Sequence, residues 1–157
     1  MFKITLEHMT ANDVFAVRDL TVQRSGDPVF KRVKHFQFLK WPNYGIPDSP
    51  AELADFVWEV YTNPGSGSSP TVIHCSGGLG RSGTFTAVFG ALQRTSDYLD
   101  GHAAGDGLRD LSLVPSIERM RRQRHPWMVE GTHQLTLAYQ TLGILLQRLL
   151  VEKKEIS

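Results

Sequence analysis

The sequence has a single cysteine, no long apolar run and almost no net charge. One cysteine in 157 residues excludes an internal disulfide and is typical of a protein of a reducing compartment. No stretch approaches the roughly 20 apolar residues of a membrane-spanning helix, and residues 1–10 lack the apolar core of a signal peptide. A formal charge of +1 argues against a general nucleic-acid-binding protein. Together these features predict a cytoplasmic protein without membrane insertion.

The sequence also lacks internal repeats, and its six histidines show no metal-ligand spacing, so we predict neither a metal nor another cofactor. A hydrophobic fraction of 41% is ordinary for a globular protein, and we expect one domain over residues 1–157. One cluster of arginines stands out, and we interpret it as a partly solvated helix face: Arg119, Arg121, Arg122 and Arg124.

The most informative segment is residues 72–84, with the sequence VIHCSGGLGRSGT. Here Cys75 ends an apolar run, and five residues separate it from Arg81 at the start of a predicted helix. A loop with so little side-chain bulk can turn its backbone N–H groups inward, and the following helix adds its free amides and positive dipole end. Such a ring of donors binds a phosphate and favours a thiolate, whose pKa can fall from about 8.5 to between about 3.5 and 7.5.

Each neighbour of the thiol then acquires a chemical role. Cys75 is the candidate nucleophile, and the planar donor fork of Arg81 suits two oxygens of a phosphoryl group. The Ser82 hydroxyl can stabilise the sulfur as a leaving group, and His74 can hydrogen-bond nearby backbone and fix the loop.

Other interpretations of this segment are weaker. A lone cysteine after an apolar run is often a small core residue, but the surrounding loop argues against that here. Gly78, Gly80 and Gly83 fit the dinucleotide-binding G-x-G-x-x-G pattern, but the acidic residues at a suitable distance, Asp97 and Asp100, fall on no second strand. The lysine of a nucleotide-binding P-loop is also missing.

Residues 72–84 resemble the signature loop of the protein tyrosine phosphatases. Residues 41–50, WPNYGIPDSP, resemble the mobile loop of that family, in which an aspartic acid protonates the leaving tyrosine oxygen; here Asn43 takes its place. A carboxamide gives no proton, and general acid catalysis contributes about 10² to 10⁴-fold, or about 3 to 5 kcal/mol of barrier. Asp48 is a candidate substitute acid, but we predict that it caps the helix that begins near Ala51. The sequence is compatible with two origins of Asn43, a natural substitution and an introduced one.

A third block, residues 121–135, resembles the glutamine-bearing loop of the same family. Gln134 matches a glutamine that helps to position the hydrolytic water, whereas Glu130 replaces the other glutamine. A carboxylate beside a phosphocysteine would repel the dianion, although it can also polarise water. Glu130 can alternatively cap or solvate the last helix.

The resemblance points to the classical branch of the family, because the Trp-Pro loop is present. Phosphoinositide phosphatases of this chemistry often carry lysine in the signature loop, and no lysine occurs in residues 76–82. Dual-specificity phosphatases share the cysteine–arginine spacing. The resemblance implies catalytic roles for Cys75, Arg81, Ser82, Asn43 and Gln134. It implies substrate-binding roles for Ser76, Gly77, Gly78, Leu79, Gly80, Arg81 and Glu130.

The implied function is hydrolysis of phosphotyrosine in a protein or peptide through a cysteinyl-phosphate, weakened by Asn43. The alternative is a pseudophosphatase that binds phosphotyrosine proteins as a scaffold. The implied fold is α/β, a mixed β-sheet with helices on both faces. Because the N-terminal helices, the ring-clasping loop and the glutamate loop of the family are absent, we expect the C-terminal part of the family domain.

The chain pattern predicts four strands and four helices. The expected strands are Phe2–Leu6, Val14–Val22 and Val29–Leu39, the last two joined by a turn at residues 25–28, and a buried strand at Thr71–Cys75. The expected helices are Ala51–Tyr61, Ser82–Asp97, Pro115–Arg124 and Gly131–Lys153, with loops at residues 63–70 and a flexible excursion at Gly101–Gly107.

Overall fold

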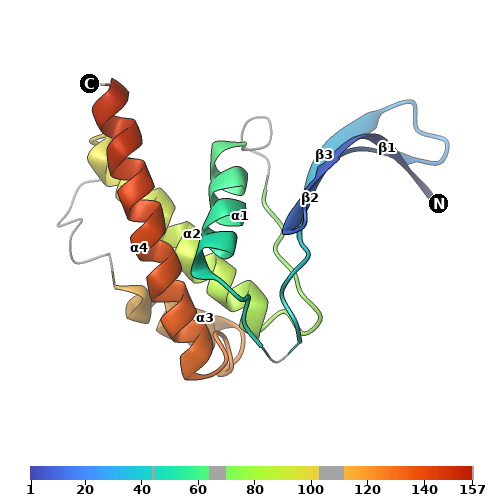
Figure 1. Ribbon diagram of the computed structural model, residues 1–157. Coiled ribbons are helices and arrows are strands. Elements are labelled where there is room, and N and C mark those ends of the chain that lie inside the picture. The colour runs from blue at the N-terminus through green and yellow to red at the C-terminus, as the bar shows by residue number, and fades with distance from the viewer. Residues whose placement is uncertain (44, 64–69, 103–111, 157) are drawn as a thin grey trace.

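The computed structural model describes residues 1–43, 45–63, 70–102 and 112–156 and contains three strands followed by four helices (Figure 1). The strands are β1 (Phe2–Ala11), β2 (Phe15–Arg24) and β3 (Phe30–Phe38). The helices are α1 (Pro50–Thr62), α2 (Gly80–Leu99), α3 (Leu113–Gln123) and α4 (Gly131–Ile156). Each corresponds to a predicted element with shifted ends, and β1 runs five residues beyond the predicted limit.

The three strands form an antiparallel sheet in the order β1-β2-β3. Asn12 shapes the turn between β1 and β2, because its side-chain oxygen accepts hydrogen bonds from the amides of Val14 and Phe15, both at 2.8 Å. The predicted turn at residues 25–28 joins β2 to β3, and Gly26 supplies its positive φ of 84°.

Helix α1 begins with Ser49 as N-cap, whose side chain accepts from the Ala51 amide at 3.2 Å, and with Pro50 in the first turn. The prediction that Asp48 caps this helix is therefore wrong. The N-cap oxygen must lie one residue before the first helical residue, and that residue is Pro50 rather than Ala51.

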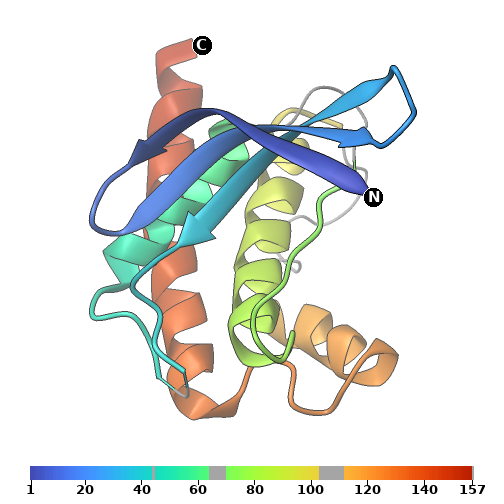
Figure 2. The same ribbon diagram turned by 90° about the vertical axis from the view of Figure 1, so that its right-hand side faces the viewer.

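The core lies between the helices, where Leu53, Leu92 and Leu145 are fully buried on α1, α2 and α4. Aromatic rings extend it to the sheet: Phe56 on α1 lies 5.7 Å from Phe15 and 5.3 Å from Phe38, measured between ring centroids. The helices all lie on one side of the sheet (Figures 1 and 2). The strands thus contact the core through Phe15, Phe36 and Phe38 of β2 and β3, and β1 is exposed along its whole length.

The α/β class is confirmed, but two finer expectations change. Thr71–Cys75 forms no strand, and Val72 is 83% exposed, because none of the described strands pairs with its backbone. The described sheet therefore has no parallel pair, and its second face has no helices among the described residues. The excursion predicted at Gly101–Gly107 and the loop at residues 63–70 lie largely outside the described residues.

Candidate active site

The cysteine loop, which we define as residues 75–81, leads directly into the first turn of α2. The amide of Gly78 donates a hydrogen bond to Cys75 Sγ at 3.1 Å. Leu79 stands at the N-cap of α2 and its side chain makes no cap hydrogen bond, whereas the amide of Ser82 in the first turn is directed at the Cys75 sulfur. Ser76 and Gly77 lie exposed in the same loop. This arrangement suits an anion bound beside the sulfur.

The thiol of Cys75 is activated by its surroundings. Burial raises its pKa, but hydrogen bonds from the Ser82 side chain and from the amides of Ser82, Leu79 and Gly78 together lower the pKa by more than burial raises it. The resulting pKa is about 7. Ser82 Oγ is buried and makes no hydrogen bond of ordinary geometry among the described residues. Its hydroxyl dipole beside the sulfur still favours the thiolate. A substantial fraction of Cys75 is therefore ionised at neutral pH.

Arg81 connects the cysteine loop to the tryptophan loop, which we define as residues 41–48. Its Nη1 donates to the Trp41 carbonyl oxygen at 3.1 Å, and its Nη2 donates to Ser76 Oγ at 2.8 Å and to Asn43 Oδ1. The guanidinium is thus held by neutral acceptors. A phosphate with its negative charge would bind these donors more strongly, because charge-assisted hydrogen bonds are about twice as strong as neutral ones.

The tryptophan loop has two buried residues, Trp41 and Pro47. Trp41 is 8% exposed, and its Nε1 donates to the Gly45 carbonyl oxygen at 3.0 Å. Asn43 and Asp48 are exposed. Within the described residues Asp48 makes no hydrogen bond to the cysteine loop or to Arg81, so this conformation provides no contact that supports Asp48 as a substitute acid.

Two of the arginines predicted to be partly solvated also hold backbone at the site, a role that the sequence analysis missed. Arg124 Nε donates to the Gly78 carbonyl oxygen at 3.1 Å. Arg121 donates to the carbonyl oxygens of Met128 and Val129 at 3.0 and 3.2 Å, beside a Val129 backbone with a φ of 61°. The signal in the sequence that could have indicated this role is the position of both arginines within residues 121–135, the block that resembles the glutamine-bearing loop.

Three glycines permit the close packing of this site. A Cβ on Gly78, whose φ is 67°, would lie 2.7 Å from Arg124 Nη2. A Cβ on Gly80 would lie 2.8 Å from Gln134 Nε2, and one on Gly83 would lie 2.8 Å from the Val129 amide nitrogen. At Gly83 a side chain would displace the backbone that connects α3 to α4, whereas at Gly78 and Gly80 it would displace the side chains of Arg124 and Gln134.

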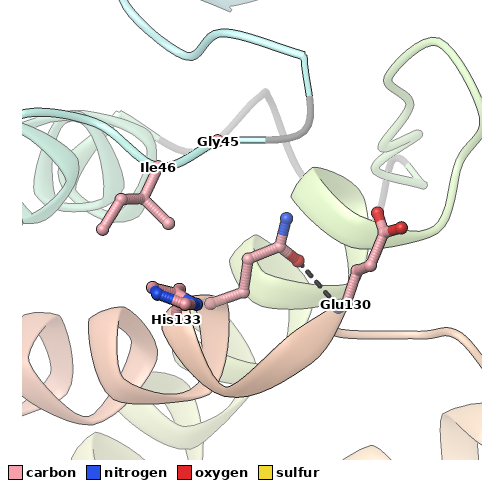
Figure 3. Close-up of a pocket in the computed structure, with 5 residues that line it drawn as sticks. Gly45, Ile46, Glu130 and His133 are labelled. Atoms are coloured by element: carbon pink, nitrogen blue, oxygen red, sulfur yellow. Dashed lines mark hydrogen bonds between the residues drawn. The ribbon is translucent and has the colours of Figure 1, made fainter.

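Gln134 and Glu130 lie beside the cysteine loop at the start of α4. Gln134 is buried, and its Oε1 accepts from the Glu130 amide at 2.8 Å and from Thr84 Oγ1 at 3.3 Å. Both residues line a cavity of about 280 Å³ that Ile46 of the tryptophan loop faces from the other side (Figure 3). Gly45 and His133 complete its lining. The exposed Glu130 carboxylate points toward the first turn of α2 (Figure 3).

His74 does not fix the cysteine loop by a hydrogen bond, contrary to the sequence-based expectation. Its side chain is exposed and makes no hydrogen bond among the described residues. The reason is the extended, unpaired course of residues 71–75, which leaves His74 at the surface. Through its charge, His74 contributes to the lowered pKa of His35, after burial and Arg18.

Within the described part of the chain, no group of three or more histidine, cysteine or acidic residues could hold a metal ion. None of the described helices is both long and apolar enough to cross a membrane.

Comparisons with known proteins agree with this geometry. The family model described as Protein-tyrosine phosphatase matches residues 1–143. The chain is 30% identical to tyrosine-protein phosphatase non-receptor type 23 of Homo sapiens over 133 residues, which are 83% of this chain and 8% of that protein.

Two solved structures share the fold. The catalytic domain of human protein tyrosine phosphatase non-receptor type 18 aligns with a TM-score of 0.74 at 29% identity, over 92% of this chain and 49% of that chain. A structure described as PTPN18 in complex with HER2-pY1248 phosphopeptides aligns with a TM-score of 0.73 at 29% identity, over 92% and 51%. The chain therefore spans about half of each solved chain and less than a tenth of the curated relative.

Proposed function

Because the chain belongs to the protein tyrosine phosphatase family and corresponds to part of its catalytic domain, we propose that it hydrolyses phosphotyrosine through a cysteinyl-phosphate on Cys75. The observation that carries this proposal is the Cys75 sulfur, which has a pKa of about 7 and accepts the Gly78 amide within an anion-binding loop. A thiolate in such a loop is both nucleophilic and placed beside the phosphorus.

In the first step the thiolate attacks phosphorus, the S–P bond forms, and the P–O bond to tyrosine breaks. The loop amides bind the phosphoryl oxygens, and Arg81 exchanges its contacts with Ser76 and Asn43 for two of these oxygens. In the second step water attacks the cysteinyl-phosphate, and the sulfur leaves as the thiolate that Ser82 and the loop amides stabilise.

The departing tyrosine oxygen receives no proton from Asn43, because a carboxamide has none to give. The Asn43 oxygen is also occupied by Arg81. We therefore infer slow turnover of phosphotyrosine, reduced by about 10² to 10⁴-fold relative to a site with a carboxylic acid.

The same proposal covers substrate, domain and location. We propose that residues 1–157 act as one domain that binds phosphotyrosine in a protein or peptide. The complex of PTPN18 with phosphopeptides supports this substrate class. A cytoplasmic location is supported by the single, reduced cysteine on which the chemistry depends.

A pseudophosphatase is the second candidate function, and Asn43 and Glu130 favour it. An intact cysteine loop without a proton donor would retain phosphotyrosine proteins rather than release phosphate. The two candidates differ in one outcome, which is Cys75-dependent turnover.

The test is turnover of p-nitrophenyl phosphate by the wild-type chain and by the Cys75→Ser and Asn43→Asp variants. We expect hydrolysis in the wild type that is abolished in Cys75→Ser. Folding of each variant is checked by circular dichroism. No turnover in any folded variant would overturn the enzyme proposal and favour the binding function.

The leaving group tests the role of Asn43. Nitrophenolate departs without a proton near neutral pH, whereas tyrosinate, with a parent pKa near 10, needs one. We expect the wild type to hydrolyse p-nitrophenyl phosphate faster than a phosphotyrosyl peptide by orders of magnitude, and Asn43→Asp to narrow this gap. Equal wild-type rates would show that another acid, such as Asp48, acts instead.

A further inference from the structure

The Glu130 carboxylate lies against the cysteine loop and has no side-chain partner among the described residues. Its Oε2 would be 3.2 Å from a Cβ placed on Gly80, within the segment that surrounds the Cys75 sulfur. Glu130 makes no side-chain hydrogen bond or ion pair among the described residues. Both of its oxygens are therefore available to accept a proton.

The neighbouring amides cannot accept that proton. The Gln134 oxygen already accepts hydrogen bonds from the Glu130 amide and from Thr84, and Gln134 Nε2 is a donor only. The Asn43 oxygen is taken by Arg81. Among the described residues that line the cavity, Glu130 and His133 are the titratable ones, and the atoms nearest to a Cβ on Gly80 belong to Gln134 and Glu130.

We propose that Glu130 is the general base that activates water to hydrolyse the cysteinyl-phosphate, an inference that rests on the proposed function. The water oxygen forms a bond to phosphorus, the S–P bond breaks, and its electron pair returns to Cys75 as thiolate. The proton of the water passes to the Glu130 carboxylate and then to solvent, and inorganic phosphate leaves. No other reactant is needed.

The cavity beside Glu130 supplies the water. Its volume of about 280 Å³ holds several water molecules, since each occupies roughly 30 Å³ in the liquid. The cavity lies between Ile46 and the start of α4 (Figure 3). Gln134 Nε2, beside Gly80, can donate to the same water or to a phosphoryl oxygen.

The positive charge of the site offsets the repulsion between Glu130 and a phosphoryl group. Arg81 lies in the cysteine loop itself, and the Arg124 guanidinium packs against Gly78 of the same loop. The charge of these two guanidinium groups, together with the loop amides, thus offsets that of the phosphoryl group and of the one carboxylate.

The experiment follows the phosphoenzyme with p-nitrophenyl phosphate, whose leaving group needs no acid. Rapid mixing gives the rate of the p-nitrophenolate burst, and intact mass after acid quench gives the phosphorylated fraction of Cys75. We expect Glu130→Gln to keep the burst rate within about twofold, to slow phosphoenzyme breakdown by about a hundredfold or more, and to accumulate phosphocysteine. Glu130→Ala serves as a second variant, and Glu118→Gln, an exposed position on α3, as the matched control.

The outcomes separate this inference from the proposed function. Phosphoenzyme that breaks down equally fast in wild type and Glu130→Gln would overturn the base role and leave the phosphatase intact. Faster turnover in Glu130→Gln would show that the carboxylate only repels substrate. An effect of the same size in His133→Gln would assign the base to His133. No Cys75-dependent phosphoenzyme in any variant would overturn both proposals.

Discussion

At Cys75, two opposing effects set the state of one sulfur atom. Burial favours the neutral thiol, whereas the Ser82 side chain and three backbone amides favour the thiolate, and the second effect is larger. The thiolate is therefore favoured by hydrogen-bond donors, first the Ser82 side chain and then the backbone amides. This explains why a loop without lysine can activate its cysteine at neutral pH.

The pH dependence of alkylation tests this account. Above a pKa of about 7 the thiolate predominates, and below it the thiol does, so iodoacetamide labelling of the single cysteine should be half-maximal near pH 7. Ser82→Ala removes the largest of the effects that lower the pKa, and the midpoint should move to higher pH. Ser116→Ala on α3 is the control. An unchanged midpoint in Ser82→Ala would contradict the role of Ser82.

The residues of the site differ in how well the sequence predicted them. Cys75 and Arg81 were identifiable because their spacing and the glycines between them specify a phosphate-binding loop. Arg124 was not, because its bond to the Gly78 carbonyl oxygen joins positions 46 residues apart. A side chain that binds a distant backbone atom leaves no periodic pattern in the sequence.

Among the elements, α2 carries the cysteine loop at its start and is held at its far end by a partly buried polar contact. Tyr61 on α1 donates its hydroxyl to Ser96 Oγ on α2 at 2.7 Å, and Ser96 in turn donates to Asp100 at 3.3 Å. This chain fixes α1 against α2, and α1 also follows the tryptophan loop. The relative position of the two loops thus depends on a bond remote from both.

Removal of that bond has a measurable cost. Tyr61→Phe leaves the buried Ser96 hydroxyl without its donor, and a hydrogen bond of this kind contributes about 1 kcal/mol. We expect the melting temperature to fall by about 2 to 4 °C. Tyr139→Phe on α4, whose hydroxyl bonds to no described residue, is the matched control. Equal melting temperatures for the two variants would show that the contact does not stabilise the fold.

At the scale of the whole molecule, one aromatic side chain joins the sheet to the helices. The Phe56 ring lies 5.7, 5.3 and 5.6 Å from the rings of Phe15, Phe38 and Phe85, on two strands and on α2. Since β1 is exposed throughout, the other apolar contact of the sheet with the core comes from β2 and β3, and includes Phe36. The attachment of the sheet therefore rests on a small cluster.

Phe56→Ala should accordingly destabilise the whole fold. The loss of a buried phenylalanine costs about 3 to 5 kcal/mol, because transfer and cavity effects add. We expect a large fall in the urea midpoint and faster amide hydrogen exchange in β2 and β3. Phe30→Ala, at a site that is 54% exposed on β3, should change little. Similar losses in the two variants would contradict the linking role of Phe56.

The sequence by itself determined the class of the fold, the helices and three strands, and it singled out Cys75 and Arg81 as candidate catalytic residues. These depend on local propensity, periodicity and short spacing, which a sequence displays directly. The tertiary structure decided that residues 71–75 remain unpaired, that Arg81 holds Asn43, and that Glu130 borders a cavity of about 280 Å³ and lies beside Gly80. Such features require partners that are distant along the chain, and only folding brings those partners together.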